Sequence, residues 1–284
     1  MPHSITDRGL TLTLTLVTLP GLKDVGEEME QLAHRCSHWL SDDELARIGR
    51  ATLPGLSLRQ RLVRLCLRAE LARQTQMTPD AFRFDYGPQG KPELRRQQGG
   101  PFAFNLSHSG DRLLLAVISG HDDRCEYNND LYLGVDIERK RTNTDINAIY
   151  RHYFSAPEQA YLVSLDNAQK RDAFFDLWAL KESYIKATGR GLAEGLHSFA
   201  FDLEQATACD KEGFKQFYQG LEPAMLSQHQ GDIRWQSWLG HIDSDYRVAV
   251  TLGACGEVGA EPTLTLTQHS LHSLLSEFNS HIPL

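Results

Sequence analysis

The chain has 284 residues, of which 41% are hydrophobic and 23% are charged, a composition typical of globular proteins. Its net charge of −8 argues against a dedicated nucleic-acid binder, because such proteins carry an excess of positive charge. No apolar run approaches the ~20 residues that span a bilayer, and the N-terminus lacks the pattern of a secretion signal. The five cysteines are scattered without a Cys-x-x-Cys pair, so reduced thiols and a cytoplasmic location are expected.

The N-terminal third predicts one strand followed by helices. Residues 10–19 alternate threonine with leucine or valine, which is the pattern of a half-buried strand. Residues 24–40 have helical periodicity, and residues 41–44 resemble the start of a further helix. A helix is also predicted over residues 58–74, and the segment 50–73 carries six arginines and one acid. This basic face indicates either an anion site or a solvated surface.

The middle of the chain predicts strands separated by turns. Residues 87–92 are rich in glycine and proline, which indicates a turn. Residues 102–106 and 113–119 have the composition of strands, and we expect residues 107–110 to form a tight loop between them.

The polar stretch 120–130 is the predicted boundary between an N-terminal half, residues 1–125, and a C-terminal half, residues 126–284. The second half predicts helices at 145–153, 156–165, 170–188 and 271–279 and strands at 197–203, 233–241, 246–252 and 263–267. Because helices and strands do not alternate strictly, an α+β fold is expected rather than a doubly wound sheet.

Two acidic clusters suggest a metal site. Asp136 and Glu138 follow a short apolar run, and side chains two apart on a strand point to the same face. On a helix, Glu182 and Lys186 lie one turn apart on one face. Three convergent carboxylates beside a lysine suit Mg²⁺, which binds hard oxygen ligands and substrate phosphates.

Each motif alone also has a simpler interpretation. An Asp-x-Glu at a strand end is often a solvated edge, and Glu182 with Lys186 has the spacing of an ordinary helical ion pair. Ser107 and His108 lack a nearby nucleophile elbow and orienting acid, so a loop that binds phosphate is favoured over a hydrolase triad. The histidines lack zinc-ligand spacing, which favours hard oxygen ligands over a transition metal.

Taken together, three motifs resemble the 4′-phosphopantetheinyl transferases of the larger, Sfp-type branch. The motifs are Phe104–Gly110, Gly134–Glu138 and Phe175–Leu192, and the resemblance is close from Gly90 to about Leu192. It implies a monomer with an α+β fold of two similar halves, related by pseudo-twofold symmetry, and an active site at their interface.

The resemblance implies transfer of the 4′-phosphopantetheine arm of coenzyme A to a serine of an apo carrier protein, releasing adenosine 3′,5′-bisphosphate. Asp136, Glu138 and Glu182 would bind Mg²⁺, or Mn²⁺ in its place. The residues implied in binding coenzyme A are Arg47, Arg59, Lys91, Ser107, His108, Asp136, Lys181 and Lys186. Glu158 matches the family's general base, and Lys181 and Lys186 complete the implied catalytic set.

Two other functions stay open on the sequence. A different Mg²⁺-dependent enzyme would release inorganic phosphate or pyrophosphate and would need no carrier protein. A non-catalytic relative would bind coenzyme A or a carrier protein, but such a module has no need of three acids and Lys186. Carrier proteins of fatty acid, polyketide, nonribosomal peptide and polyunsaturated fatty acid synthesis are all compatible partners.

Overall fold

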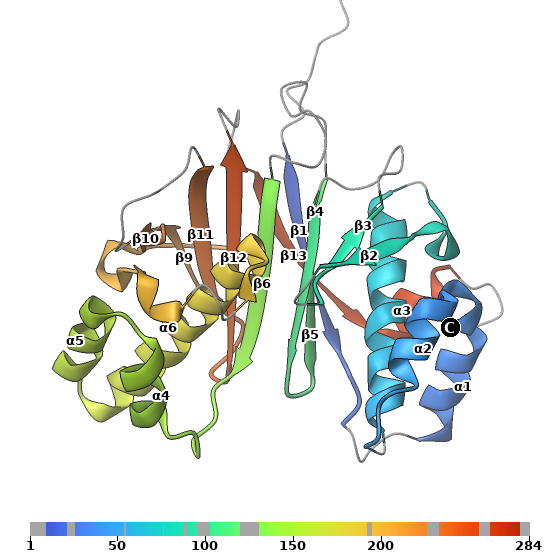
Figure 1. The fold of residues 1–284 in the computed structure, drawn as a ribbon, viewed down its shortest axis with the longest axis horizontal. Coiled ribbons are helices and arrows are strands. Elements are labelled where there is room, and N and C mark those ends of the chain that lie inside the picture. The colour runs from blue at the N-terminus through green and yellow to red at the C-terminus, as the bar shows by residue number, and fades with distance from the viewer. Residues whose placement is uncertain are drawn as a thin grey trace, which may run out of the picture.

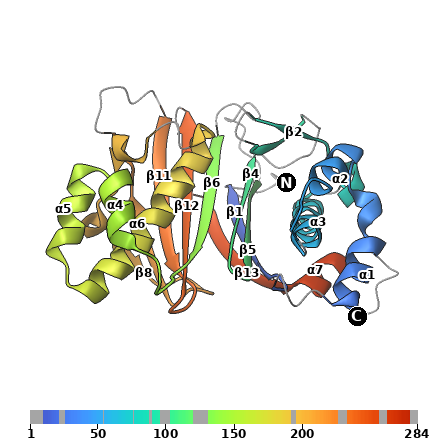
Figure 2. The same ribbon diagram turned by 60° about the horizontal axis from the view of Figure 1, so that its bottom comes forward.

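Two β-sheets form the middle of the molecule, and a group of helices covers the outer face of each (Figures 1 and 2). The first sheet has the strand order β13-β1-β5-β4, and the second has the order β6-β12-β11-β9-β8. The structure is a computed structural model that describes residues 10–21, 26–53, 55–75, 77–87, 90–95, 103–119, 131–191, 195–225, 233–255 and 262–278.

The first half is built around the long helix α3 (Leu56–Gln74). Its sheet contains β1 (Thr11–Thr18), β4 (Ala103–Ser109), β5 (Arg112–Ser119) and β13 (Thr263–Ser270). The other elements are α1 (Glu27–Arg35), α2 (Asp42–Ile48), α7 (Leu271–Ser276) and the hairpin of β2 (Phe84–Tyr86) and β3 (Pro92–Leu94). One apolar core joins α3 to the sheet.

The second half is built around the long helix α6 (Asn167–Thr188). Its sheet contains β6 (Leu131–Arg139), β8 (Thr207–Cys209), β9 (Gln216–Leu221), β11 (Ile233–His241) and β12 (Tyr246–Cys255). The other elements are α4 (Ile146–Tyr153), α5 (Ala156–Ser164) and the short pair of β7 (Phe199–Ala200) and β10 (Ala224–Met225). Within the described ranges, no helix combines the length and the apolar character needed to cross a bilayer.

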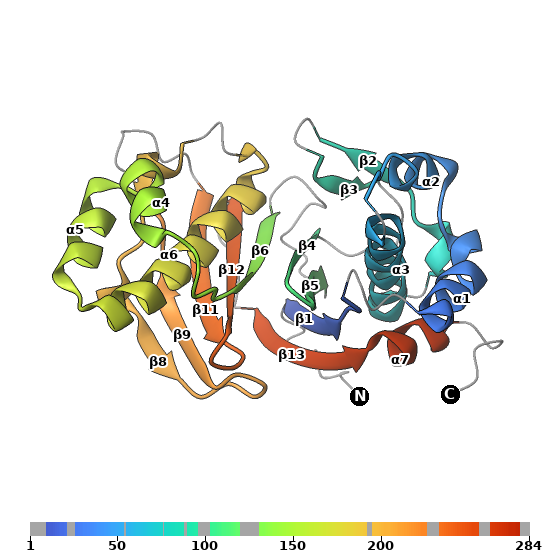
Figure 3. The same ribbon diagram turned by 90° about the horizontal axis from the view of Figure 1, so that it is seen from below.

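The two halves repeat one topology. In each, a first strand is followed by helices and then by a hairpin whose second strand pairs antiparallel with the first strand, which gives the orders β1-β5-β4 and β6-β12-β11. The expected α+β fold of two similar halves is therefore confirmed. The boundary predicted at residue 125 lies outside the described residues and stays a prediction, but β13 and α7, from the end of the chain, lie with the first half (Figure 3).

The sheets pack against each other through an apolar core of their own. Alternate residues of β1, beginning with Leu12 and Leu14, meet alternate residues of β6, including Val135 and Ile137. Because successive side chains of a strand point to opposite faces, the residues between them face a helix. Gly134, Asp136 and Glu138 are therefore on the face of β6 that α6 covers, as the sequence predicted for the two acids.

The tight loop predicted at residues 107–110 is wrong. Strand β4 continues through Ser109, and the chain turns at Gly110, whose φ is 58°. The apolar residues of β4 end at Leu106, but the strand continues beyond them. Its alternate polar residues Asn105, Ser107 and Ser109 all form hydrogen bonds with β6. Hydrophobic patterning alone could not detect this part of the strand.

The predicted basic face of α3 is also only partly correct. Arg68 is fully buried, and its Nη2 lies 2.6 Å from Oε2 of Glu44 on α2. The same guanidinium donates from Nη1 to the carbonyl of Pro79. Arg68 is therefore a structural link within the first half and contributes nothing to a basic surface.

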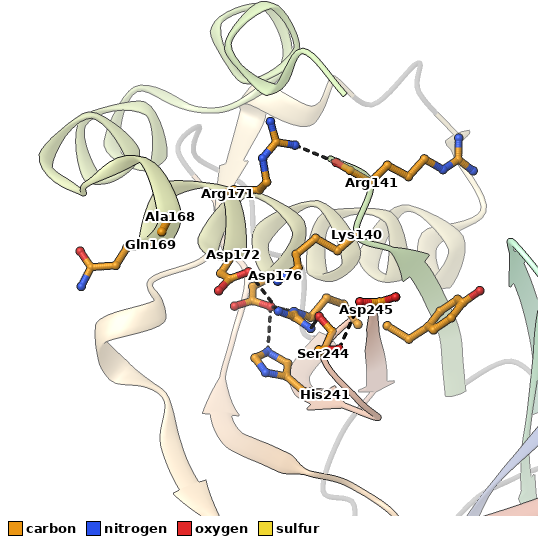
Figure 4. A network of polar contacts seen from close by, with 12 residues as sticks. Lys140, Arg141, Ala168, Gln169, Arg171, Asp172, Asp176, His241, Ser244 and Asp245 are labelled. Carbon is orange, nitrogen blue, oxygen red and sulfur yellow. Dashed lines mark hydrogen bonds and ion pairs between the residues drawn. The ribbon is translucent and has the colours of Figure 1, made fainter. Parts of the chain in front are cut away.

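A polar network fastens the first half of α6 to the β11–β12 hairpin (Figure 4). Asp176 Oδ1 lies 2.9 Å from Nε2 of His241 and 2.9 Å from Nε of Arg247. The contact with Arg247 is an ion pair, because this N–H is not aligned for a hydrogen bond. Asp172 Oδ1 lies 2.6 Å from Nζ of Lys140. The contacts of Asp176 anchor α6 at the end remote from Glu182 and Lys186, while the pair of Asp172 with Lys140 is more exposed.

Gly134 is a point of close approach between α6 and β6. A Cβ at residue 134 would lie 2.0 Å from the carbonyl oxygen of Ser183 and 2.3 Å from the nitrogen of Ala187, both backbone atoms. We predict that Gly134→Ala lowers the free energy of unfolding by about 1–3 kcal/mol or more, because α6 must move away from the sheet. Urea denaturation followed by circular dichroism measures this loss.

The matched control is Gly26→Ala, at which a Cβ would meet no described atom within 4 Å. Because Gly26 is the N-cap of α1, where alanine is less favourable, this substitution is expected to lower stability by no more than about 1 kcal/mol. Equal stability of the two variants would contradict the close packing of α6 on β6.

Candidate active site

A cavity of about 950 Å³ lies between the two halves. The first half lines it with α2, α3, β4 and the β2–β3 hairpin, and the second half lines it with the C-terminal end of α6. Its basic lining residues are Arg47, Arg50, Arg59, Arg64, Lys91, His108 and Lys186. The cavity therefore brings together residues that lie far apart in the sequence, and it offers a strongly basic surface to an anionic ligand.

A compact polar centre, formed by Ser107, Asp136 and Lys186, joins β4, β6 and α6. The ammonium of Lys186 lies 2.7 Å from Asp136 Oδ1 and donates to Ser107 Oγ, also at 2.7 Å. Ser107 Oγ in turn donates to Asp136 Oδ1 at 2.8 Å. Asp136 is only 3% exposed, so its ion pair with Lys186 is shielded from water on one side. The structure thus brings three of the predicted site residues into direct contact.

The polar side chains of β4 extend this contact along β6. Ser109 Oγ donates to Oε2 of Glu138 at 3.0 Å, and Asn105 Oδ1 accepts from the backbone nitrogen of Val135 at 3.2 Å. The sequence analysis missed Asn105 and Ser109. Their spacing of two from Ser107 is the signal that could have identified them, because residues two apart share one face of a strand.

Burial shapes the electrostatics of the acidic end. Desolvation raises the pKa of Glu138 to about 7, and the charge of Asp136 adds to this effect. Desolvation and Asp136 also raise the pKa of Glu182, against the opposing charge of Lys186. Burial lowers the pKa of His108, and the positive charges of Arg59 and Lys186 lower it further, so a neutral imidazole faces the cavity. The three carboxylates therefore favour an added positive charge.

The donor set fits a hard divalent cation. Asp136 Oδ2 is buried without a hydrogen-bond partner in the described structure, and Asp136 interacts electrostatically with Glu138 and Glu182. Mg²⁺ suits such a site, because it takes few protein oxygens and fills its remaining positions with water and phosphate. Among the described residues, however, no three Asp, Glu, His or Cys side chains have the spacing of a formed metal centre. The carboxylates are of the chemical type that binds Mg²⁺. In this structure, the ammonium of Lys186 lies beside Asp136 and neutralises part of their negative charge.

The opposite end of the cavity is aromatic and basic. The guanidinium of Arg47 lies 4.0 Å from the ring centroid of Tyr86, and Arg64 Nη1 donates to the Tyr86 hydroxyl at 2.8 Å. Arg59 also lines the cavity, but its guanidinium donates to the carbonyls of Pro20 and Gly110. Arg47 is exposed and Arg59 is buried, so these two residues, both predicted to bind coenzyme A, differ in how freely they can reach a ligand.

Two predicted residues lie elsewhere. Glu158 is 2% exposed, and its Oε2 lies 2.7 Å from Nζ of the fully buried Lys181. Glu158 also accepts from the backbone of Phe201, and Lys181 donates to the carbonyl of Phe199. Neither residue lines the cavity. The general-base role of Glu158 and the substrate role of Lys181 remain predictions that this placement argues against, because the pair braces α6 from its other face.

Two similar α+β halves thus enclose a polar centre beside a basic interfacial cavity, whose charge suits an anionic ligand such as a phosphate ester. The sequence profile of the 4′-phosphopantetheinyl transferase superfamily matches residues 132–251. A putative 4′-phosphopantetheinyl transferase of Synechocystis sp. is 30% identical over 217 residues, which cover 73% of this chain and 84% of the relative. The chain therefore belongs to the 4′-phosphopantetheinyl transferase superfamily, as an enzyme of its Sfp-type branch.

Two further relatives, HetI and Sfp, support this assignment. The 4′-phosphopantetheinyl transferase HetI of Nostoc sp. is 37% identical over 157 residues, which cover 55% of this chain and 62% of HetI. Sfp of Bacillus subtilis is 32% identical over 139 residues, which cover 49% of this chain and 55% of Sfp. A solved holo-(acyl-carrier-protein) synthase of Bacillus anthracis, in complex with CoA (3′,5′-ADP), covers 44% of this chain and 96% of its own at 15% identity and a TM-score of 0.32.

We predict that Lys181→Met destabilises the protein by about 3–5 kcal/mol, because it leaves the carboxylate of Glu158 buried and unpaired. The double variant Lys181→Met, Glu158→Leu is expected to recover most of that loss, since it removes both charges. The control Lys140→Met removes an ion pair with a half-exposed acid and is expected to cost less than about 1 kcal/mol. Chemical denaturation measures all three, and a stable Lys181→Met variant would contradict the buried pair.

The pKa of Glu138 predicts a pH dependence of stability in metal-free buffer. Its folded-state pKa is raised from 4.5 to about 7, so its stabilising contribution is present below the lower value and is lost as the pH rises through the higher one. Glu138→Gln keeps a neutral side chain at every pH. The Tm of this variant relative to that of the unaltered protein should therefore rise as the pH increases from about 5 to about 8. A constant Tm difference across this range would show that Glu138 has an ordinary pKa.

Proposed function

We propose that the protein transfers the 4′-phosphopantetheine arm of coenzyme A to a serine hydroxyl of an apo carrier protein, with Mg²⁺ as the metal. Adenosine 3′,5′-bisphosphate is the other product. The observation that carries this proposal is the contact of Lys186 with Asp136 and Ser107 at the acidic end of a cavity whose other end is basic. Family membership supplies the reaction class, and the cavity supplies a binding site of matching charge.

The cavity suits coenzyme A in size and in charge. A volume of about 950 Å³ lies within the range of small-molecule sites, which run to about 1,000 Å³. Arg47 and Arg64 supply positive charge for phosphate groups, and Tyr86 between them offers an aromatic face for the adenine. His108, a neutral imidazole, lines the cavity, and Ser107 adds a hydroxyl group beside Lys186.

Asp136, Glu138 and Glu182 would hold Mg²⁺, or Mn²⁺ in its place. The metal supplies neutralisation of the pyrophosphate charge as the reaction proceeds. Lys186 adds a second positive charge at the same place, and its ammonium can exchange Asp136 for a phosphate oxygen as its partner. In phosphoryl transfer most of the catalysis comes from such positioning and charge stabilisation.

The serine oxygen of the carrier protein forms a bond to the β-phosphorus of coenzyme A. The bond from this phosphorus to the bridging oxygen breaks, and adenosine 3′,5′-bisphosphate leaves with that oxygen. The serine proton must pass to a base. The resemblance implies Glu158 for this step, although Glu158 is buried and does not line the cavity.

One chain is sufficient for this site, because both halves of the cavity come from the same polypeptide. A monomer in the cytoplasm is accordingly the proposed active form. The proposed partners are carrier proteins of fatty acid, polyketide or nonribosomal peptide synthesis, and neither nucleic acid nor a membrane takes part.

We predict that Asp136→Ala and Glu182→Ala each reduce transfer by at least about 100-fold while the fold stays intact, because the metal loses a ligand. The measurement is the intact mass of an apo carrier protein after incubation with the enzyme, coenzyme A and Mg²⁺. One added phosphopantetheine mass, lost with EDTA, is expected for the unaltered protein. The control is Asp172→Ala, a half-exposed acid in the first half of α6, remote from Glu182, which should leave transfer unchanged.

Other outcomes would contradict the proposal. Near-normal transfer by Asp136→Ala at the usual Mg²⁺ concentration would show that Asp136 is not a metal ligand. Release of inorganic phosphate or pyrophosphate from a nucleotide without a carrier protein would indicate the other Mg²⁺-dependent chemistry. Binding of coenzyme A without any transfer to several apo carriers would indicate a non-catalytic relative.

A further inference from the structure

The ammonium of Lys91 contacts three backbone carbonyls. It donates to Lys186 O at 2.7 Å, to Ala187 O at 3.2 Å and to Leu133 O at 3.3 Å. A lysine ammonium has three N–H donors and no acceptor. These three contacts use its full donor capacity, so in this arrangement Lys91 has no N–H left for a phosphate of the ligand, although its side chain lines the cavity.

Two of these carbonyls belong to the last turn of α6, where backbone acceptors lack partners within the helix. Ile185 O is satisfied inside the helix end by the nitrogen of Gly189 at 2.9 Å. Lys186 O and Ala187 O instead receive the ammonium of Lys91. A positive charge at this position also interacts favourably with the helix dipole. Lys91 therefore acts as a C-terminal cap that comes from a distant part of the chain.

The third carbonyl lies on the open side of β6. This strand is at the edge of its sheet, so backbone groups on that side need partners from outside the sheet. Asn105 accepts from Val135 N, and Lys91 donates to Leu133 O. One ammonium thus joins the backbone of the strand that carries Asp136 to the backbone of Lys186 itself.

Lys91 belongs to the β2–β3 hairpin, which borders the basic end of the cavity. The hairpin is held by hydrogen bonds from Gly87 N to Lys91 O at 3.0 Å and from Gly90 N to Gly87 O at 2.9 Å. Tyr86, the last residue of β2, contacts Arg47 and Arg64. The fixed turn therefore links the basic end of the cavity to the end of α6.

We propose that Lys91 is a positioning residue whose ammonium ties the β2–β3 hairpin to α6 and β6 and so sets the place of Lys186 beside the cavity. This role differs from the place near the adenine or its phosphates that the resemblance implies. Burial lowers the pKa of Lys91, which agrees with an ammonium held among carbonyls rather than in water. The kinetic part of the test rests on the proposed transferase function, and the stability part does not.

The experiment compares Lys91→Met and Lys91→Arg with the control Lys140→Met. The Tm of each variant is measured without ligand, and kcat and the KM for coenzyme A are measured by carrier-protein transfer. Lys91→Met is expected to lower Tm by about 2–8 °C, because the end of α6 loses its cap. It is expected to lower kcat by about 10- to 100-fold through misplacement of Lys186, with a smaller change in KM.

Lys91→Arg separates positioning from simple charge. A guanidinium presents its donors in a planar fork, so it cannot direct three N–H groups from one nitrogen at three converging carbonyls. The arginine variant should therefore behave like Lys91→Met in both Tm and kcat. Lys140→Met, which removes only a surface ion pair with Asp172, should change neither by much.

Three results would overturn the proposal. Full activity and Tm in Lys91→Arg would show that only the charge matters. An unchanged ligand-free Tm in Lys91→Met, with a raised KM for coenzyme A, would show a direct ligand contact. A lowered Tm with normal kcat would show a cap that does not position Lys186. Absence of transfer by the unaltered protein would refute the proposed function while the Tm comparison would still test the cap.

Discussion

The contact of α6 with β6 at Gly134 is the constraint on which the site depends. Because residue 134 has no side chain, the helix backbone lies directly on the strand, within reach of Ser183 O and Ala187 N. This approach brings the acid of β6, Asp136, to the lysine of α6, Lys186. A larger residue at position 134 would move Lys186 on α6 away from Asp136 on β6, even if every charged side chain were retained.

Much of the second half serves to hold α6 in this position. The network around Asp176 fixes its first half, and the buried pair of Lys181 with Glu158 braces the face opposite the cavity. A chain of buried hydroxyl groups, from Ser183 through Thr251 to Ser237, adds contacts of 2.7 and 2.8 Å beneath the helix. Such rigid support is what charge stabilisation requires, since donors and acceptors must not reorganise during the reaction.

Local patterns in the sequence predicted most of the elements and the central contact. The Thr-Leu alternation predicted β1, helical periodicity predicted α6, and the spacing of Asp136 with Glu138 correctly placed both on one face of β6. These successes share a cause, because each depends on neighbours within one element.

The failures depended on contacts between elements. Lys181 and Glu182 are adjacent in the sequence but point to different sides of α6, Lys181 toward Glu158 and Glu182 toward the cavity. The sequence predicts Arg68 as part of a basic face, but in the structure it forms a buried ion pair with Glu44. The sequence assigns Lys91 to the binding of coenzyme A, and only the structure shows that its ammonium donates to carbonyls at the end of α6.

The central claim is that Asp136 and Lys186 form the point at which metal and substrate phosphates meet. A crystal structure of the protein with coenzyme A and Mg²⁺ tests it most directly. The account predicts the metal on Asp136 Oδ2, the pyrophosphate beside Lys186 and the adenosine end near Tyr86. A metal bound away from Asp136, or coenzyme A outside the cavity between the two halves, would contradict it.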